Sequence, residues 1–134
     1  MAALSVHHIG VAVDDLDEAI GRYASLFGAR LEHRDRVEEQ GVEAASLRVG
    51  DSRIELLAPT GPETPVGRFL AKRGPGMHHV AFLVEDVAVE LERVRAEGAE
   101  PIDETPRRGL FGLQVAFVHP QSTGGVLAEF VADG

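Results

Sequence analysis

Residues 7–16 read HHIGVAVDDL, and residues 78–87 read HHVAFLVEDV. The two stretches lie 71 residues apart in a chain of 134 residues, so each opens one half of the sequence. Apolar residues at helical spacing follow each stretch, and each pattern stops at a glycine, Gly28 or Gly98. The self-similarity predicts two copies of one structural module.

Strand patterns follow both predicted helices, and a short helical pattern joins the two halves. One helix and four strands are too little to bury a core well, so we expect the modules to share one. The predicted fold is α+β, with two pseudo-symmetric βαβββ modules (about residues 1–60 and 75–134) in a single domain over 1–134. The predicted strands after the helices are 29–38, 41–49, 53–58, 99–104, 112–118 and 125–131, and the joining helix is 66–73.

The amino-acid composition excludes several classes of function. The formal net charge is −9, from 13 basic and 22 acidic residues, which argues against a nucleic-acid-binding protein. The chain has no cysteine, so any metal must be held by histidines and carboxylates. Its N-terminus has no secretory pattern, and its apolar runs are too short to cross a membrane, so we expect a cytoplasmic protein.

Strand alternation places one histidine of each repeat on the face away from the predicted helix. His8 shares that face with Gly10, and His79 shares it with Ala81. The neighbouring His7 and His78 have the opposite phase, which favours packing or supporting hydrogen bonds.

The last strand of each half carries one acid in an apolar run, Glu55 in RIELLAP and Glu129 in GVLAEFV. A carboxylate buried there needs a cation, a metal or solvent. A single strand histidine is more often a core residue, and a single strand glutamate more often lies at a solvated edge. Because the His-then-Glu layout occurs twice, we expect His8, Glu55, His79 and Glu129 to meet at one divalent ion, such as Co²⁺, Mn²⁺, Zn²⁺ or Ni²⁺.

The paired strands, RIELLAP and HPQSTGGVLAEF resemble the vicinal oxygen chelate (glyoxalase/bleomycin resistance/dioxygenase) superfamily. Within it the chain is most similar to the methylmalonyl-CoA epimerase family. The segments that carry this resemblance are EEQGVEAASLRVG, PVGRFLAKRGPGMHHVAF and PRRGLFGLQVAFVHPQSTGGVLAEF.

The resemblance implies an open, cupped sheet around one metal, usually Co²⁺, with the same four residues as ligands. It implies a homodimer that acts on an acyl-CoA substrate and interconverts (2R)- and (2S)-methylmalonyl-CoA. Some family members carry Gln at the position of Glu55. We take Glu129 as the candidate for one catalytic acid/base.

One position departs from the family. Several members carry a second acid/base Glu where this chain has Ala44, and the adjacent Glu43 has the phase of the apolar face. The second proton carrier is therefore unassigned. The cations available for the CoA phosphates form two clusters, Arg68, Lys72 and Arg73 in one and Arg107 and Arg108 in the other.

Two other functions stay open. The chain could be another metalloenzyme of the superfamily, such as a glyoxalase-like lyase or a dioxygenase, although four protein ligands do not suit the 2-His-1-carboxylate oxygenases. It could also be a non-catalytic small-molecule-binding member, and such members generally lack the metal ligands.

Overall fold

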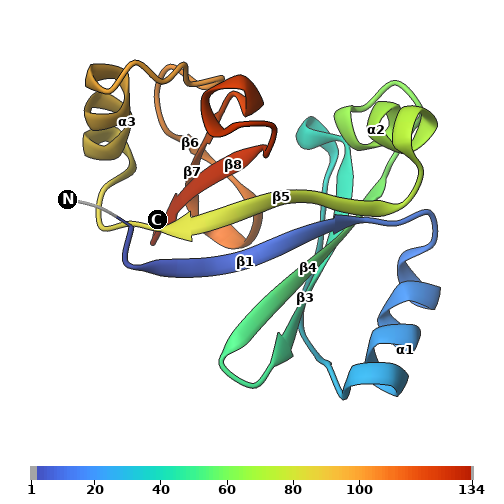
Figure 1. Ribbon diagram of the computed structural model, residues 1–134. Helices are drawn as coiled ribbons and strands as arrows, with labels where there is room; N and C mark the ends of the chain where they lie inside the picture. The colour runs from blue at the N-terminus through green and yellow to red at the C-terminus, as the bar shows by residue number, and fades with distance from the viewer. Residues whose placement is uncertain (1–2, 134) are drawn as a thin grey trace. The chain divides into compact units, whose positions relative to one another are not determined.

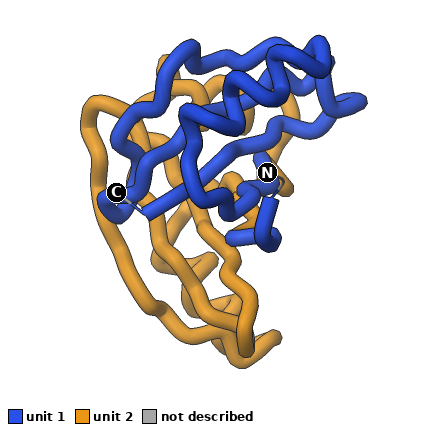
Figure 2. The backbone as a smooth tube through the Cα atoms, turned by 90° about the vertical axis from the view of Figure 1, so that its left-hand side faces the viewer, with its two compact units in different colours: residues 1–7, 79–134 blue, residues 8–78 orange. Residues whose placement is uncertain are grey.

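The computed structural model describes residues 3–133 and divides the chain into two compact units. Unit 1 contains residues 1–7 and 79–134, and unit 2 contains residues 8–78 (Figure 2). Both boundaries fall within the repeated strands, β1 (Ser5–Ala12) and β5 (Gly76–Leu83). Leu4, just before β1, is held in unit 1, where its backbone N–H donates to the Leu83 carbonyl at 2.8 Å.

Unit 2 has the strand order β2-β3-β4-β1, with β4 parallel to β1 and the other pairs antiparallel. Helix α1 begins where the Asp15 carboxylate accepts the Glu18 N–H at 3.0 Å, and it ends at Gly28, whose φ is +69°. The predicted helices and strands of this half are confirmed with small shifts at their ends. They are α1 (Leu16–Phe27), β2 (Arg30–Val37), β3 (Val42–Val49), β4 (Ser52–Pro59) and α2 (Pro65–Arg73), and a short 3₁₀ helix spans Glu38–Gln40.

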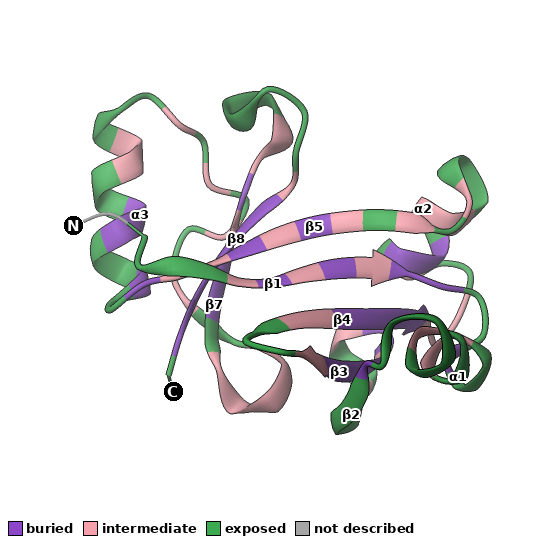
Figure 3. Cartoon of the chain, turned by 60° about the horizontal axis from the view of Figure 1, so that its bottom comes forward, coloured by how far each residue is buried: buried purple, intermediate pink, exposed green. Residues whose placement is uncertain are grey.

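The core of unit 2 lies between α1 and one face of β3 and β4 (Figures 1 and 3). Leu16 of the helix packs with Leu47 and Leu56 of these strands, and both strand leucines are fully buried. Since side chains alternate along a strand, Glu55 lies on the opposite face from Leu56. The predicted division of β4 into an apolar face and a carboxylate face is confirmed.

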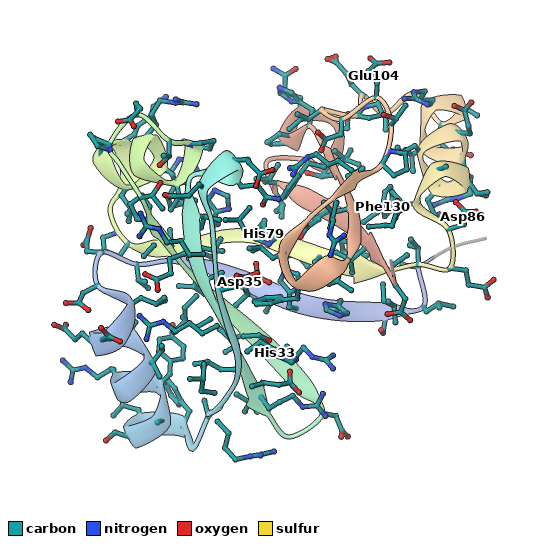
Figure 4. The ribbon with its side chains drawn as sticks, turned by 180° about the vertical axis from the view of Figure 1, so that it is seen from behind. His33, Asp35, His79, Asp86, Glu104 and Phe130 are labelled. Atoms are coloured by element: carbon teal, nitrogen blue, oxygen red, sulfur yellow. The ribbon has the colours of Figure 1, made fainter. Side chains whose placement is uncertain are left out.

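Unit 1 repeats this plan with the order β5-β8-β7-β6, in which β8 is parallel to β5 and the other pairs are antiparallel. Helix α3 packs against β7 and β8, with Leu91 buried beside Phe130 (labelled in Figure 4). The two βαβββ modules and the α+β class are therefore confirmed. The elements are α3 (Val87–Ala96), β6 (Arg107–Arg108), β7 (Gln114–Val118) and β8 (Ala128–Ala132), with 3₁₀ helices at Leu110–Gly112 and Pro120–Thr123.

Two predicted strand ranges in unit 1 are wrong. Residues 99–104 form only a single bridge, at Pro101, and the strand beside β7 is the two-residue β6. Pro101 lacks an N–H for a ladder, and the Asp103 carboxylate accepts the Phe117 N–H at 2.8 Å in place of a strand partner. The last strand starts at Ala128 rather than at residue 125, because Gly125 has a φ of +115°.

No helix among the described residues is long and apolar enough to span a membrane.

Candidate metal centre

His8 and Glu55 form a buried pair in unit 2. Gly10 is in register with Glu55 on the adjacent parallel strand, and His8 lies two residues before Gly10 on the same face. The His8 Nε2 atom is 3.6 Å from the Glu55 Oε2 atom, and the two side chains are only 4% and 7% exposed. Because Gly10 has no side chain, nothing projects from β1 between the imidazole and the carboxylate.

His79 and Glu129 form the matching pair in unit 1. Ala81 is in register with Glu129, as Gly10 is with Glu55, and His79 lies two residues before Ala81. The His79 Nε2 atom is 3.3 Å from the Glu129 Oε1 atom, and these side chains are 3% and 9% exposed. Figure 4 labels His79 on β5. Each unit therefore brings its predicted histidine and glutamate together at the same strand register.

The spacing within each pair suits two donors on one ion. Ligand atoms about 2.1 Å from a metal lie roughly 3.0 Å apart at a right angle and roughly 3.4 Å apart at the tetrahedral angle. The observed distances of 3.3 Å and 3.6 Å are close to this range. A carboxylate this deeply buried requires compensation by positive charge. Imidazole nitrogen with carboxylate oxygen is a donor set typical of divalent transition metals.

The strands next to the two pairs carry different side chains. Ser46 of β3 lies directly opposite Glu55, whereas Phe117 of β7 lies directly opposite Glu129. The Phe117 and His79 rings meet edge to face, with centroids 5.6 Å apart and an interplanar angle of 86°. The contact between Phe117 and His79 was not predicted from the sequence. Pairing the predicted strand 112–118 with the strand that carries Glu129 would have placed Phe117 there.

Ala44 lies on the carboxylate face of β3, fully buried and directly opposite Asp35 of β2. Glu43 has the opposite phase, as predicted, and its carboxylate accepts the Arg34 Nε–H at 3.2 Å. Arg34 also donates to Asp17 of α1 at 2.6 Å. The bond to Asp17, and a weaker one to Glu43, raise the pKa of the Arg34 guanidinium. Glu43 is thus held on the helix side, away from Glu55.

The remaining histidines with described contacts have structural partners. The ring of His78 packs edge to face on that of Phe69, with centroids 4.9 Å apart, which confirms its predicted packing role. The His119 Nδ1 atom accepts the Gln121 N–H at 3.1 Å and caps the 3₁₀ helix before β8.

Comparisons with known proteins identify the family of the chain. Residues 7–117 match the family model of the glyoxalase/bleomycin resistance protein/dioxygenase superfamily. The ethylmalonyl-CoA/methylmalonyl-CoA epimerase of Cereibacter sphaeroides is 32% identical, over 92% of this chain and 94% of that protein.

Solved structures extend the similarity over almost the whole fold. Methylmalonyl-CoA epimerase from Mycobacterium tuberculosis superposes with a TM-score of 0.94 at 36% identity, covering 98% of this chain and 89% of that one. A methylmalonyl-CoA epimerase in complex with methylmalonyl-CoA and NH4+ gives a TM-score of 0.95 at 37% identity, covering 99% and 96%.

Proposed function

Since the chain belongs to the glyoxalase/bleomycin resistance protein/dioxygenase superfamily, we propose that it catalyses metal-dependent interconversion of (2R)- and (2S)-methylmalonyl-CoA. The observation that carries the proposal is the buried His–Glu pair, repeated at the same register in both units. It occurs in a chain similar over nearly its full length to enzymes named for this reaction.

We propose that His8, Glu55, His79 and Glu129 hold one divalent ion. A group made of His8, His79 and Glu129 has the side-chain types that could hold a metal ion, and Glu55 adds a second carboxylate. When bound, the ion supplies positive charge that stabilises the thioester oxygen as the α-proton leaves. The four side chains fix where that charge lies, and their burial keeps water from weakening it.

Inversion at the α-carbon needs a proton acceptor on one face and a proton donor on the other. We propose Glu129 for one of these roles, although binding to a metal lowers the basicity of a carboxylate. For the other role, the carboxylate face of unit 2 offers two more titratable side chains on β2, His33 opposite Ser46 and Asp35 opposite Ala44 (both labelled in Figure 4). The Asp35 Oδ1 atom accepts the Arg36 N–H at 2.8 Å, which fixes the carboxylate beside the strand.

The proposed function also includes the identity of the metal, the residues that bind the CoA phosphates and the oligomeric state. We propose Co²⁺ as the preferred ion, a homodimer as the active state and a cytoplasmic location. For the CoA phosphates we propose Lys72 and Arg73 in the last turn of α2, where the Arg73 guanidinium is already held over the Phe69 ring at 5.7 Å. Metal analysis and light scattering of the purified protein test the first two points.

Incubation of the Co²⁺-loaded protein with one methylmalonyl-CoA epimer in D₂O tests the function. We expect deuterium at the α-carbon and appearance of the other epimer. Ethylmalonyl-CoA serves as a parallel substrate, because the Cereibacter sphaeroides relative is named for both. Absence of exchange with either substrate in metal-loaded protein would rule the epimerase out, and absence of stoichiometric metal would favour a non-catalytic binding protein.

A further inference from the structure

Arg107 lies on the same face of unit 1 as the His79–Glu129 pair. It is directly opposite Val115 in the β6–β7 pair, and cross-strand partners share a face. Phe117 follows two residues after Val115 and lies opposite Glu129, so all of these side chains project to one side. Alternation points the adjacent Arg108 to the other side.

The Arg107 guanidinium is held in a fixed orientation. Its Nε–H donates to the Asp103 Oδ1 atom at 3.1 Å, and the Asp103 Oδ2 atom accepts the Phe117 N–H at 2.8 Å. The carboxylate is thereby tied to the backbone of β7 and in turn sets the plane of the guanidinium. The guanidinium carbon lies 5.7 Å from the centroid of the Phe117 ring, which is a cation–π contact.

This arrangement leaves binding capacity on Arg107. Within residues 3–133, its Nη donors make no hydrogen bond to another residue, and its side chain is 41% exposed. A guanidinium with one edge fixed and the other available is preorganised for a carboxylate, because less side-chain entropy is lost when the ligand binds. In a chain with a net charge of −9, such a cation stands out as a site for an anion.

The distances indicate which anion it meets. Only two ring contacts, of 5.7 Å and 5.6 Å, separate the guanidinium from the imidazole of His79. A thioester placed at the His79–Glu129 pair would have its own acyl group within this span. The CoA phosphates would lie beyond it, at the far end of the pantetheine arm.

We propose that Arg107 binds the free carboxylate of the acyl group and so selects 2-carboxyacyl-CoA substrates over simple acyl-CoA thioesters. The inference rests on the proposed function, which places the thioester at the metal centre. It replaces the phosphate-binding role expected for Arg107 from its place in the sequence. Asp103 acts as its positioning residue.

Calorimetric titration of the metal-loaded, full-length protein tests this assignment. The ligands are malonyl-CoA, which has the carboxylate, propionyl-CoA, which lacks it, and CoA alone. A lost hydrogen bond between charged groups should weaken malonyl-CoA binding by Arg107→Gln about ten- to hundredfold, and leave the other two ligands within about threefold. Arg107→Lys should fall between, because it keeps the charge and loses the planar fork.

Arg36→Gln is the matched control, since Arg36 is an exposed arginine of β2 that pairs with Glu38 of the following 3₁₀ helix. It should change none of the three affinities. Equal weakening of all three ligands by Arg107→Gln, or of none, would overturn the inference. The deuterium exchange assay reports separately on the proposed function. If Arg107→Gln weakens only malonyl-CoA binding but the wild-type protein exchanges no α-proton, the role of Arg107 stands and the epimerase function is excluded.

Discussion

The proposal that His8, Glu55, His79 and Glu129 hold one ion makes a specific prediction for His8→Ala and His79→Ala. Each variant removes one imidazole from one unit and leaves the other His–Glu pair intact. If all four ligands hold the same ion, either substitution alone should abolish metal-dependent stabilisation of the chain. If each unit bound its own ion, each variant would keep half of the effect.

The expected size follows from the length of the chain. Metal at a hundredfold excess over its dissociation constant stabilises the folded state by about 2.7 kcal/mol. At about 2.1 cal/mol/K of unfolding entropy per residue, 134 residues give about 0.28 kcal/mol/K. The wild-type Tm should therefore rise by about 10 °C on addition of Co²⁺, and the Tm of either alanine variant by no more than about 1–2 °C.

Differential scanning calorimetry of the metal-free and metal-loaded protein measures the shift, and elemental analysis measures the stoichiometry. Comparing each variant with its own metal-free form removes the intrinsic cost of the substitution. His119→Asn is the control, because it removes a histidine outside the two pairs and keeps a side-chain acceptor for the Gln121 N–H. Two ions per wild-type chain, with one retained by each alanine variant, would refute the shared site.

Three further predictions concern the same centre. Glu55→Gln should keep Co²⁺ binding within about tenfold, because the amide oxygen can still bind the metal. Glu129→Gln should reduce α-proton exchange at least about a hundredfold at saturating metal. Equal exchange activity in the two variants would argue against Glu129 as a proton carrier. Metal-dependent stabilisation should shrink as the pH falls from 7 to 5, since protons compete with the metal for neutral imidazole, and a calorimetric shift independent of pH would contradict histidine ligation. Asp35→Asn should slow epimer formation more than His33→Gln does if Asp35 is the second proton carrier, and the reverse order would assign that role to His33.

The repeat made the candidate site predictable, because strand alternation gives His8 and His79 the same phase and each half carries one acid in its last apolar strand. The same alternation correctly predicted that Glu43 lies on the helix side of β3, where its carboxylate accepts from Arg34. The connection after α3 was not predictable in this way. Residues 99–104 were predicted to be a strand, but Pro101 lacks an N–H donor and the Asp103 side chain accepts the Phe117 N–H. A side chain that substitutes for a ladder hydrogen bond leaves no periodic signal in the sequence.

The register also shows where the two modules have diverged. Glu55 lies opposite Ser46 and Glu129 lies opposite Phe117, so these two neighbours occupy equivalent positions. One step further along each sheet, Asp35 opposite Ala44 corresponds to Arg107 opposite Val115. The two His–Glu pairs have thus kept their chemistry, while an equivalent outer position carries a carboxylate in one unit and a guanidinium in the other.

Such divergence is what the proposed reaction requires. In the proposed function the two modules supply equivalent donors to one ion, but a substrate with one thioester and one carboxylate has no twofold symmetry of its own. Its carboxylate needs a fixed cation on one side. Arg107 is such a cation, because Asp103 and Phe117 hold its guanidinium in place. Its α-carbon needs a titratable group that a guanidinium cannot replace, since arginine keeps its proton at any physiological pH. If Asp35 is the second proton carrier, the double variant Asp35→Arg, Arg107→Asp should therefore show no α-deuterium exchange in D₂O with metal and fold retained, and continued exchange would exclude Asp35 from that role.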